Sequence, residues 1–206
     1  MNWLRRVERA LEESLEGAPP LRPHPLELAR RLERALVDGA RRLGRARYAP
    51  NRFVCRLPEP PGPETEGLAG HLAQVARDRG YRLVGPLEVE VLPGPGEIQG
   101  FFTGAGGGPA LGLVEGLLGP AQGLTAVVPP EGLVVGRGEE VGLRLADPGV
   151  SRQHLRVSVL EGRVLLEDLG SRNGTRVGRR RLEAPAEVPP GARVELGEST
   201  LRVWVL

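Results

Sequence analysis

Three stretches near the start of the chain carry apolar side chains at helical spacing. The apolar positions are Trp3, Val7, Leu11 and Leu15 in the first stretch, Leu28, Leu32, Ala35, Leu36 and Leu43 in the second, and Leu68, Leu72, Val75 and Ala76 in the third. Gly17 ends the first stretch, and Pro25 suits the first turn of the second, which runs to about Arg42. Thr65 is a candidate N-cap for the third stretch, which stops at Gly80. The spacing predicts three amphipathic helices.

Two segments of the same region alternate as half-buried strands do. In residues 52–57, Phe53, Cys55 and Leu57 lie on one side and polar residues dominate the other, so Cys55 is expected to be a core thiol. Residues 81–92 form strand, bend and strand, with the bend at Gly85-Pro86. The pattern predicts an α+β domain over residues 1–92.

Residues 93–122 hold ten glycines, four prolines and no arginine. This composition predicts a Gly/Pro-rich linker of flexible coil, although the apolar piece 111–119 could dock on a neighbouring domain. From residue 123 onward, short apolar runs alternate with turn residues, and Glu161-Gly162 suits a tight hairpin. Residues 123–206 are therefore expected to form an all-β sandwich.

Charge adds one alternative function to this picture. The net charge is only +2 and all 28 basic residues are arginine. Five of these arginines crowd a passage from helix to strand, namely Arg41, Arg42, Arg45, Arg47 and Arg52. They could bind nucleic acid or the ribosome with a steep salt dependence, but only Tyr48 and Phe53 are nearby for base stacking, so this interpretation ranks second.

Several other classes of protein are disfavoured. A single cysteine excludes an intrachain disulfide, and no apolar run resembles a signal peptide or a membrane span, so a cytoplasmic location is predicted. The three histidines, His24, His71 and His154, share no metal-ligand spacing. Ser151, His154 and Asp168 lack a nucleophile elbow, so no catalytic residue, cofactor or metal is expected.

Three loops of the predicted sandwich carry residues suited to a phosphate ester. They contain Gly136-Arg137, Ser151-Arg152-Gln153-His154 and Gly170-Ser171-Arg172-Asn173-Gly174-Thr175. A phosphothreonine carries about −1.5 to −2 charges and three acceptor oxygens, so its binding requires a rigid arginine fork and neutral donors. These motifs, in this order and spacing, resemble those of the forkhead-associated (FHA) family, whose members bind phosphothreonine peptides.

The resemblance implies a role for each matching residue. Arg137 is expected to bind the phosphate, Ser151 to donate its hydroxyl to it, and Asn173 to hold the peptide main chain. Arg152 and Arg172 stand where family members add phosphate or peptide contacts. The residues expected to brace the loops are Gly136, His154 and Gly174.

Residues 1–92 resemble the N-terminal domain of bacterial FhaA-type proteins. The resemblance implies a signalling adaptor that acts beside Ser/Thr protein kinases in cell-wall synthesis or cell division, with phosphothreonine-containing proteins, and the kinase or its substrates, as partners. In that family the first domain can carry a phosphorylated threonine. Of Thr65, Thr103 and Thr125, Thr103 is the candidate, because it falls in the predicted flexible linker.

Overall fold

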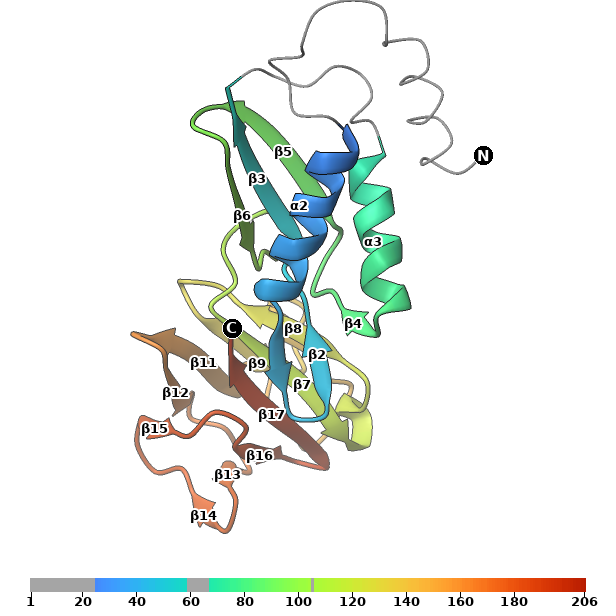
Figure 1. Cartoon of the computed structure of the whole chain (residues 1–206). Helices are drawn as coiled ribbons and strands as arrows, with labels where there is room; N and C mark the ends of the chain where they lie inside the picture. The colour runs from blue at the N-terminus through green and yellow to red at the C-terminus, as the bar shows by residue number, and fades with distance from the viewer. Residues whose placement is uncertain (1–24, 59–66, 105) are drawn as a thin grey trace, which may run out of the picture. The chain divides into compact units, whose positions relative to one another are not determined.

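The computed structural model describes residues 25–58, 67–104 and 106–206, and the chain divides into two compact units between Phe102 and Thr103 (Figure 1). The helix predicted around residues 3–16 lies outside the described residues. Each unit has a hydrophobic core of its own. The arrangement confirms the predicted fold class, an α+β unit followed by a β-sandwich.

In the described residues, two helices cover the core of the first unit. Helix α2 (Pro25–Asp38) buries Leu28, Leu32 and Leu36 completely, as their spacing predicts. It ends earlier than predicted, because the chain turns at Gly39 into a hairpin of β1 (Arg41–Leu43) and β2 (Ala46–Tyr48). Leu43 therefore lies in a strand and not on the helix face.

The second described helix of this unit is α3 (Leu68–Asp78), which buries Leu68, Leu72 and Ala76. Its N-cap is Gly67, with a φ of 99° and no side-chain hydrogen bond. The predicted cap, Thr65, lies outside the described residues. Gly80 follows the helix at a φ of 70°, which explains why the helix stops there.

Two small sheets complete the first unit. Strand β3 (Arg52–Leu57) lies between β5 (Glu88–Pro93), which is parallel to it, and β6 (Glu97–Phe101), which is antiparallel. Strand β4 (Tyr81–Arg82) pairs with β2 in the other sheet. Phe53, Cys55 and Leu57 are fully buried on one face of β3, as predicted. Burial raises the pKa of the Cys55 thiol to about 11, so it is an unreactive core residue.

The second unit is a sandwich of two sheets. Its elements in chain order are β7 (Gly112–Leu118), the short helix η2 (Gly119–Ala121), β8 (Thr125–Val128), β9 (Leu133–Gly136), β10 (Leu143–Arg144), β11 (Leu155–Leu160), β12 (Arg163–Asp168), β13 (Thr175–Val177), β14 (Arg180–Arg181), β15 (Ala186–Val188), β16 (Arg193–Leu196) and β17 (Ser199–Val205). One sheet has the order β10-β9-β11-β12-β15 and the other β14-β13-β16-β17-β7-β8. The predicted turn at Glu161-Gly162 joins β11 and β12, with φ values of 49° and 76°.

The segment expected to be a flexible linker contains two ordered strands. Residues 97–101 form β6, and residues 112–118 form β7, which lies between β17 and β8. The glycines of β7 serve close packing. A Cβ added at Gly112 would lie 2.7 Å from the Trp204 carbonyl oxygen, and one at Gly116 would lie 1.7 Å from that of Ala121. The linker prediction is therefore wrong for these strands, because glycine also occurs in strands that pack closely against neighbouring backbone.

No helix in the described ranges is both long enough and apolar enough to span a bilayer.

Candidate functional site

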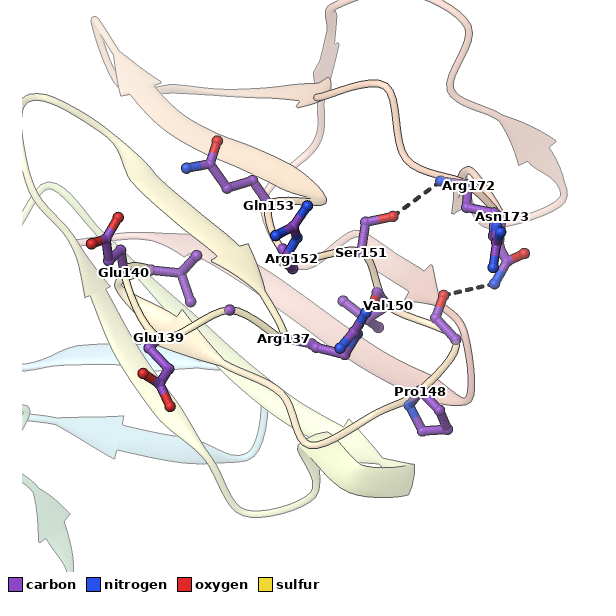
Figure 2. A pocket seen from close by; sticks show the side chains of 13 residues that line it. Arg137, Glu139, Glu140, Pro148, Val150, Ser151, Arg152, Gln153, Arg172 and Asn173 are labelled. Carbon is purple, nitrogen blue, oxygen red and sulfur yellow. Dashed lines mark hydrogen bonds between the residues drawn. The ribbon is translucent and has the colours of Figure 1, made fainter.

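One end of the sandwich carries an open cleft of about 890 Å³ (Figure 2). Its walls come from the loop after β9, the loop before β11 and the loop after β12. The lining residues are Arg137, Gly138, Glu139, Glu140, Val141, Pro148, Gly149, Val150, Ser151, Arg152, Gln153, Arg172 and Asn173. All five residues predicted to contact a phosphopeptide are among them, so the three loop motifs converge on one site.

Arg137, in the loop after β9, is held by hydrogen bonds to the loop before β11. Its backbone N–H donates to the Ser151 carbonyl at 2.9 Å, and its Nε donates to the Val150 carbonyl at 3.0 Å. This leaves the two terminal nitrogens of the guanidinium for a ligand. Within the described part of the chain, no ion pair involves Arg137, Arg152 or Arg172. The cleft therefore holds three guanidinium groups whose charge no paired carboxylate neutralises.

Ser151 and Asn173 tie two of the loops together at the mouth of the cleft (Figure 2). The Ser151 hydroxyl oxygen accepts a hydrogen bond from the Arg172 backbone N–H at 3.0 Å, so its own proton is available to an acceptor in the cleft. The Asn173 side-chain N–H₂ donates to the Gly149 carbonyl at 2.8 Å. Its carbonyl oxygen remains as an acceptor, and its second N–H as a donor, for an extended peptide.

The sequence interpretation missed three polar residues of the cleft, Glu139, Glu140 and Gln153. Glu139 and Glu140 lie across the cleft from Arg172 and Asn173 (Figure 2). Glu139 makes only a long ion pair, 3.9 Å, with the exposed Arg144. The cleft thus has an acidic side and a basic side. A peptide with unlike charges at its two ends would therefore bind more favourably in one orientation than in the other.

His154 contacts two of the cleft loops from inside the fold. It is fully buried, its Nδ1 accepts a hydrogen bond from the Ser151 backbone N–H at 3.1 Å, and its Nε2 lies 3.3 Å from the Gly174 carbonyl. Only a neutral ring with the proton on Nε2 satisfies both contacts. Burial lowers the pKa of His154, although the Gly174 hydrogen bond and the Asp168 and Asp147 carboxylates oppose this effect.

Two glycines beside the cleft meet requirements that no other residue can meet. A Cβ added at Gly136 would lie 2.2 Å from the Arg152 carbonyl oxygen. Gly174 has a φ of 78°, and an added Cβ would collide with the Arg181 guanidinium. Gly136 is therefore fixed by close approach of the neighbouring backbone, and Gly174 by its positive φ.

Asp168 organises the loop that carries Arg172 and Asn173. Its carboxylate accepts hydrogen bonds from the Ser171 backbone N–H at 2.7 Å, the Ser171 hydroxyl at 2.8 Å and the Thr175 hydroxyl at 2.7 Å. Burial favours the protonated acid, but these hydrogen bonds outweigh it and lower the pKa of Asp168. Asp168 is therefore a structural anion beneath the loop.

Asp147 performs the same task for the loop that precedes Ser151. It accepts hydrogen bonds from the backbone N–H groups of Gly149 at 2.8 Å and Glu198 at 2.9 Å, and from the Ser199 hydroxyl at 2.8 Å. Burial alone would raise the pKa of Asp147, but the donors lower it. The sequence interpretation missed this residue, although Asp147-Pro148-Gly149 is a pattern typical of side-chain-stabilised turns.

Thr103 does not lie in an accessible spacer. It is only 5% exposed and forms a β-bridge with Pro109. A kinase needs an extended, exposed segment around its acceptor hydroxyl, so the structure gives no support to phosphorylation at this residue.

The arginines that motivated a nucleic-acid-binding alternative do not form one free surface. Arg52 lies on β3, in a different sheet from the others, and pairs with Glu90 at 2.9 Å. Arg47 donates to the Tyr81 hydroxyl and lies over that ring. Tyr48 and Phe53, the aromatic residues considered for base stacking, are buried. Among the described residues no group of His, Cys, Asp and Glu is suited to a metal ion.

His154 should make the stability of the sandwich depend on pH. Because burial lowers its folded pKa below the ordinary 6.5, the unfolded chain binds a proton more readily. The stabilising contribution of the neutral ring is fully present above about pH 6.5 and is lost as the pH falls through the lowered pKa. Asp147 and Asp168 act in the same direction, but only below about pH 4.

The measurement is urea unfolding of a Trp3→Phe chain followed by the fluorescence of Trp204, at several pH values from about 7.5 to 5. We expect the midpoint to fall with pH, and His154→Gln to flatten that dependence at lower overall stability. His71→Gln, in the first unit, is the control and should leave the slope unchanged. An equal slope with and without His154 would show that this ring does not control the transition.

Comparison with known proteins agrees with this geometry. A family model described as "FHA domain" matches residues 133–197, and one described as "FhaA, N-terminal domain" matches residues 2–96. FhaB, an FHA domain-containing protein of Mycolicibacterium smegmatis, is 34% identical over 71 residues, which are 34% of this chain and 46% of the relative. The chain spans about half the length of the curated relatives it matches, 46% to 55%.

Solved structures of FHA domains resemble part of this chain. The FhaA FHA domain, crystallised with the intracellular domain of Rv3910, is 32% identical, with a TM-score of 0.40, over 45% of this chain and 98% of that one. An FHA domain studied for phosphothreonine-dependent interactions is 30% identical, with a TM-score of 0.42, over 47% of this chain and 97% of that one. Since the two family models together account for most of the sequence, the chain belongs to the FHA domain proteins and is FhaA-like, with an FhaA N-terminal domain ahead of its FHA domain.

Proposed function

We propose that this chain is a phosphopeptide-dependent adaptor that binds phosphothreonine-containing segments of partner proteins in the cleft of its FHA domain. The observation that carries the proposal is the placement of the Arg137 guanidinium and the Ser151 hydroxyl at one cleft, without a carboxylate paired to either. A phosphate dianion between them would accept charge-assisted hydrogen bonds from Arg137 and a neutral one from Ser151.

Three other cleft residues, and three residues beneath the loops, also have roles in this proposal. Asn173 holds the peptide main chain beside the phosphothreonine, and Arg152 and Arg172 add positive charge at the rim. The buried His154, Asp147 and Asp168 keep the loops in place before the ligand arrives. This preorganisation matters because a site whose donors are already oriented loses less conformational entropy on binding.

The partners are proposed from family membership. Because the chain is FhaA-like, we propose that it acts beside Ser/Thr protein kinases in the cytoplasm. There it would take part in the regulation of cell-wall synthesis or cell division. The first domain would supply a second contact, which raises avidity through effective concentration. We propose no catalytic activity for either domain.

The test is binding of the full chain to a library of peptides that carry phosphothreonine, phosphoserine or unmodified threonine at a central position. We expect phosphothreonine peptides to bind, unmodified peptides not to bind, and phosphoserine peptides to bind about tenfold more weakly, the usual effect of one missing methyl group in a fitted pocket. Equal binding of the full chain to all three kinds of peptide, or binding to none of them, would contradict the proposal.

A further inference from the structure

Next to the cleft stands a hairpin with an unusual density of arginine. Strands β13 and β14 pair with each other at one edge of the six-stranded sheet and are joined by Gly178-Arg179. Residues 175–181, here called the arginine hairpin, contain Arg176, Arg179, Arg180 and Arg181, all exposed, and no acidic residue. None of these four arginines belongs to the cleft itself.

The positive charge of the arginine hairpin is not neutralised within the fold. In the described ranges, no ion pair involves any of its four arginines. Arg176 lies directly opposite Arg181 across the strand pair, an arrangement that destabilises a sheet. Glu195 is the neighbour of Arg176 on β16, yet the two form no ion pair. A surface on which like positive charges lie opposite each other suits an anionic partner, because the partner would relieve their repulsion.

The arginine hairpin is continuous with the basic side of the cleft. The Arg181 guanidinium packs on Gly174, so closely that a Cβ there would lie 2.5 Å from one of its nitrogens. Gly174 follows directly on Arg172 and Asn173, which line the cleft. Glu139 and Glu140 lie on the other side of the cleft (Figure 2). Positive charge therefore extends from the phosphate site in one direction only, past Arg172 to the tip of the hairpin.

We propose that the arginine hairpin is a second recognition surface, which binds acidic side chains of the same phosphothreonine-bearing segment. An extended chain rises about 3.3 Å per residue, so a segment that follows β13 would place residues roughly three to six positions from the phosphothreonine over the hairpin. Planar guanidinium groups match carboxylates in a two-pronged hydrogen-bonding geometry. This inference rests on the proposed function and adds a preference to it.

The experiment uses the full chain and three phosphothreonine peptides. One has alanine at all flanking positions, one has four aspartates about three to six residues after the phosphothreonine, and one has them at the same distance before it. We expect one of the two acidic peptides to bind about tenfold more tightly than the alanine peptide at low ionic strength, as three exposed ion pairs would provide. The preference should shrink as salt is raised to physiological levels and beyond.

Variants separate this surface from the cleft. Arg179→Ser with Arg180→Ser should bring the affinity ratio of acidic to alanine peptide close to one. Arg156→Ser with Arg163→Ser removes the same charge from β11 and β12 and should leave the ratio unchanged. Equal binding of all three peptides would overturn the inference while the proposed function stands, whereas binding of none would overturn both. Binding of a short single-stranded RNA that depends on Arg179 and Arg180, without an acidic preference, would assign the hairpin to nucleic acid instead.

Discussion

Replacing Arg137 with alanine is expected to weaken phosphothreonine-peptide binding by roughly 30- to 150-fold, which corresponds to about 2 to 3 kcal/mol. The magnitude follows from the loss of charge-assisted hydrogen bonds from the guanidinium to a dianion. No ion pair of the described residues involves Arg137, and its side chain is exposed, so the fold should tolerate the change. Binding is measured by fluorescence anisotropy at one fixed salt concentration, because phosphate contacts depend on ionic strength.

Two further variants serve as controls for Arg137→Ala. Arg137→Lys retains the charge but loses the bond from Nε to the Val150 carbonyl, so we expect an intermediate loss of affinity. Arg163→Ala removes an exposed arginine that pairs with Glu187 on the neighbouring strand, and it should bind as the parent chain does. A change of less than about threefold for Arg137→Ala would mean that the phosphate is bound elsewhere.

The meeting of the three loops could be predicted from sequence because many of the residues that line the cleft sit in short local motifs. Ser151 and His154 are three residues apart, and their mutual hydrogen bond is set within a single loop. Strands β11 and β12 pair antiparallel, with Leu155 opposite Asp168, so the loop before β11 and the loop after β12 fall at the same end of the sandwich. The motif residues therefore converge once the strand pattern is right.

The anchors beneath the loops could not be predicted in the same way. Asp147 bonds to Glu198 and Ser199, which lie 51 and 52 residues further along the chain. An isolated aspartate before proline and glycine indicates a turn, but it gives no information about which distant backbone groups will donate to it. Long-range polar contacts of this kind depend on the packed fold, so the local sequence pattern does not predict them.

The same limit explains the error over residues 93–122. Strand β7 is apolar, but its glycines make it look like coil, and its partner β17 lies near the other end of the chain, as the 89-residue separation of Glu115 and Trp204 shows. Only the finished sheet shows that Gly112 and Gly116 are fixed by close approach of neighbouring carbonyl groups. The β-sandwich therefore begins well before residue 123, the boundary that the strand pattern predicts.

Removing β7 should abolish the folded state of the FHA domain. A chain that begins at Leu124 loses the strand between β17 and β8, together with the core residues Val114 and Ala121. Strand β8 then has no partner, because β7 is its only neighbour in the sheet, and β17 becomes an unpaired edge. Burial of one aliphatic side chain contributes about 1.5 to 3 kcal/mol, and a whole domain is stable by only about 5 to 15 kcal/mol.

The measurement compares thermal unfolding and peptide binding of residues 103–206 with those of residues 124–206, and the full chain serves as the reference. We expect the longer fragment to unfold cooperatively and to bind the peptide as the full chain does, while the shorter one shows no cooperative transition and no binding. A shorter fragment with a melting temperature within about 5 °C of the longer one would show that β7 contributes less than roughly 1 kcal/mol. Because the shorter fragment lacks part of the fold, its failure to bind would say nothing about the cleft, and only fragments that include β7 test the proposed function.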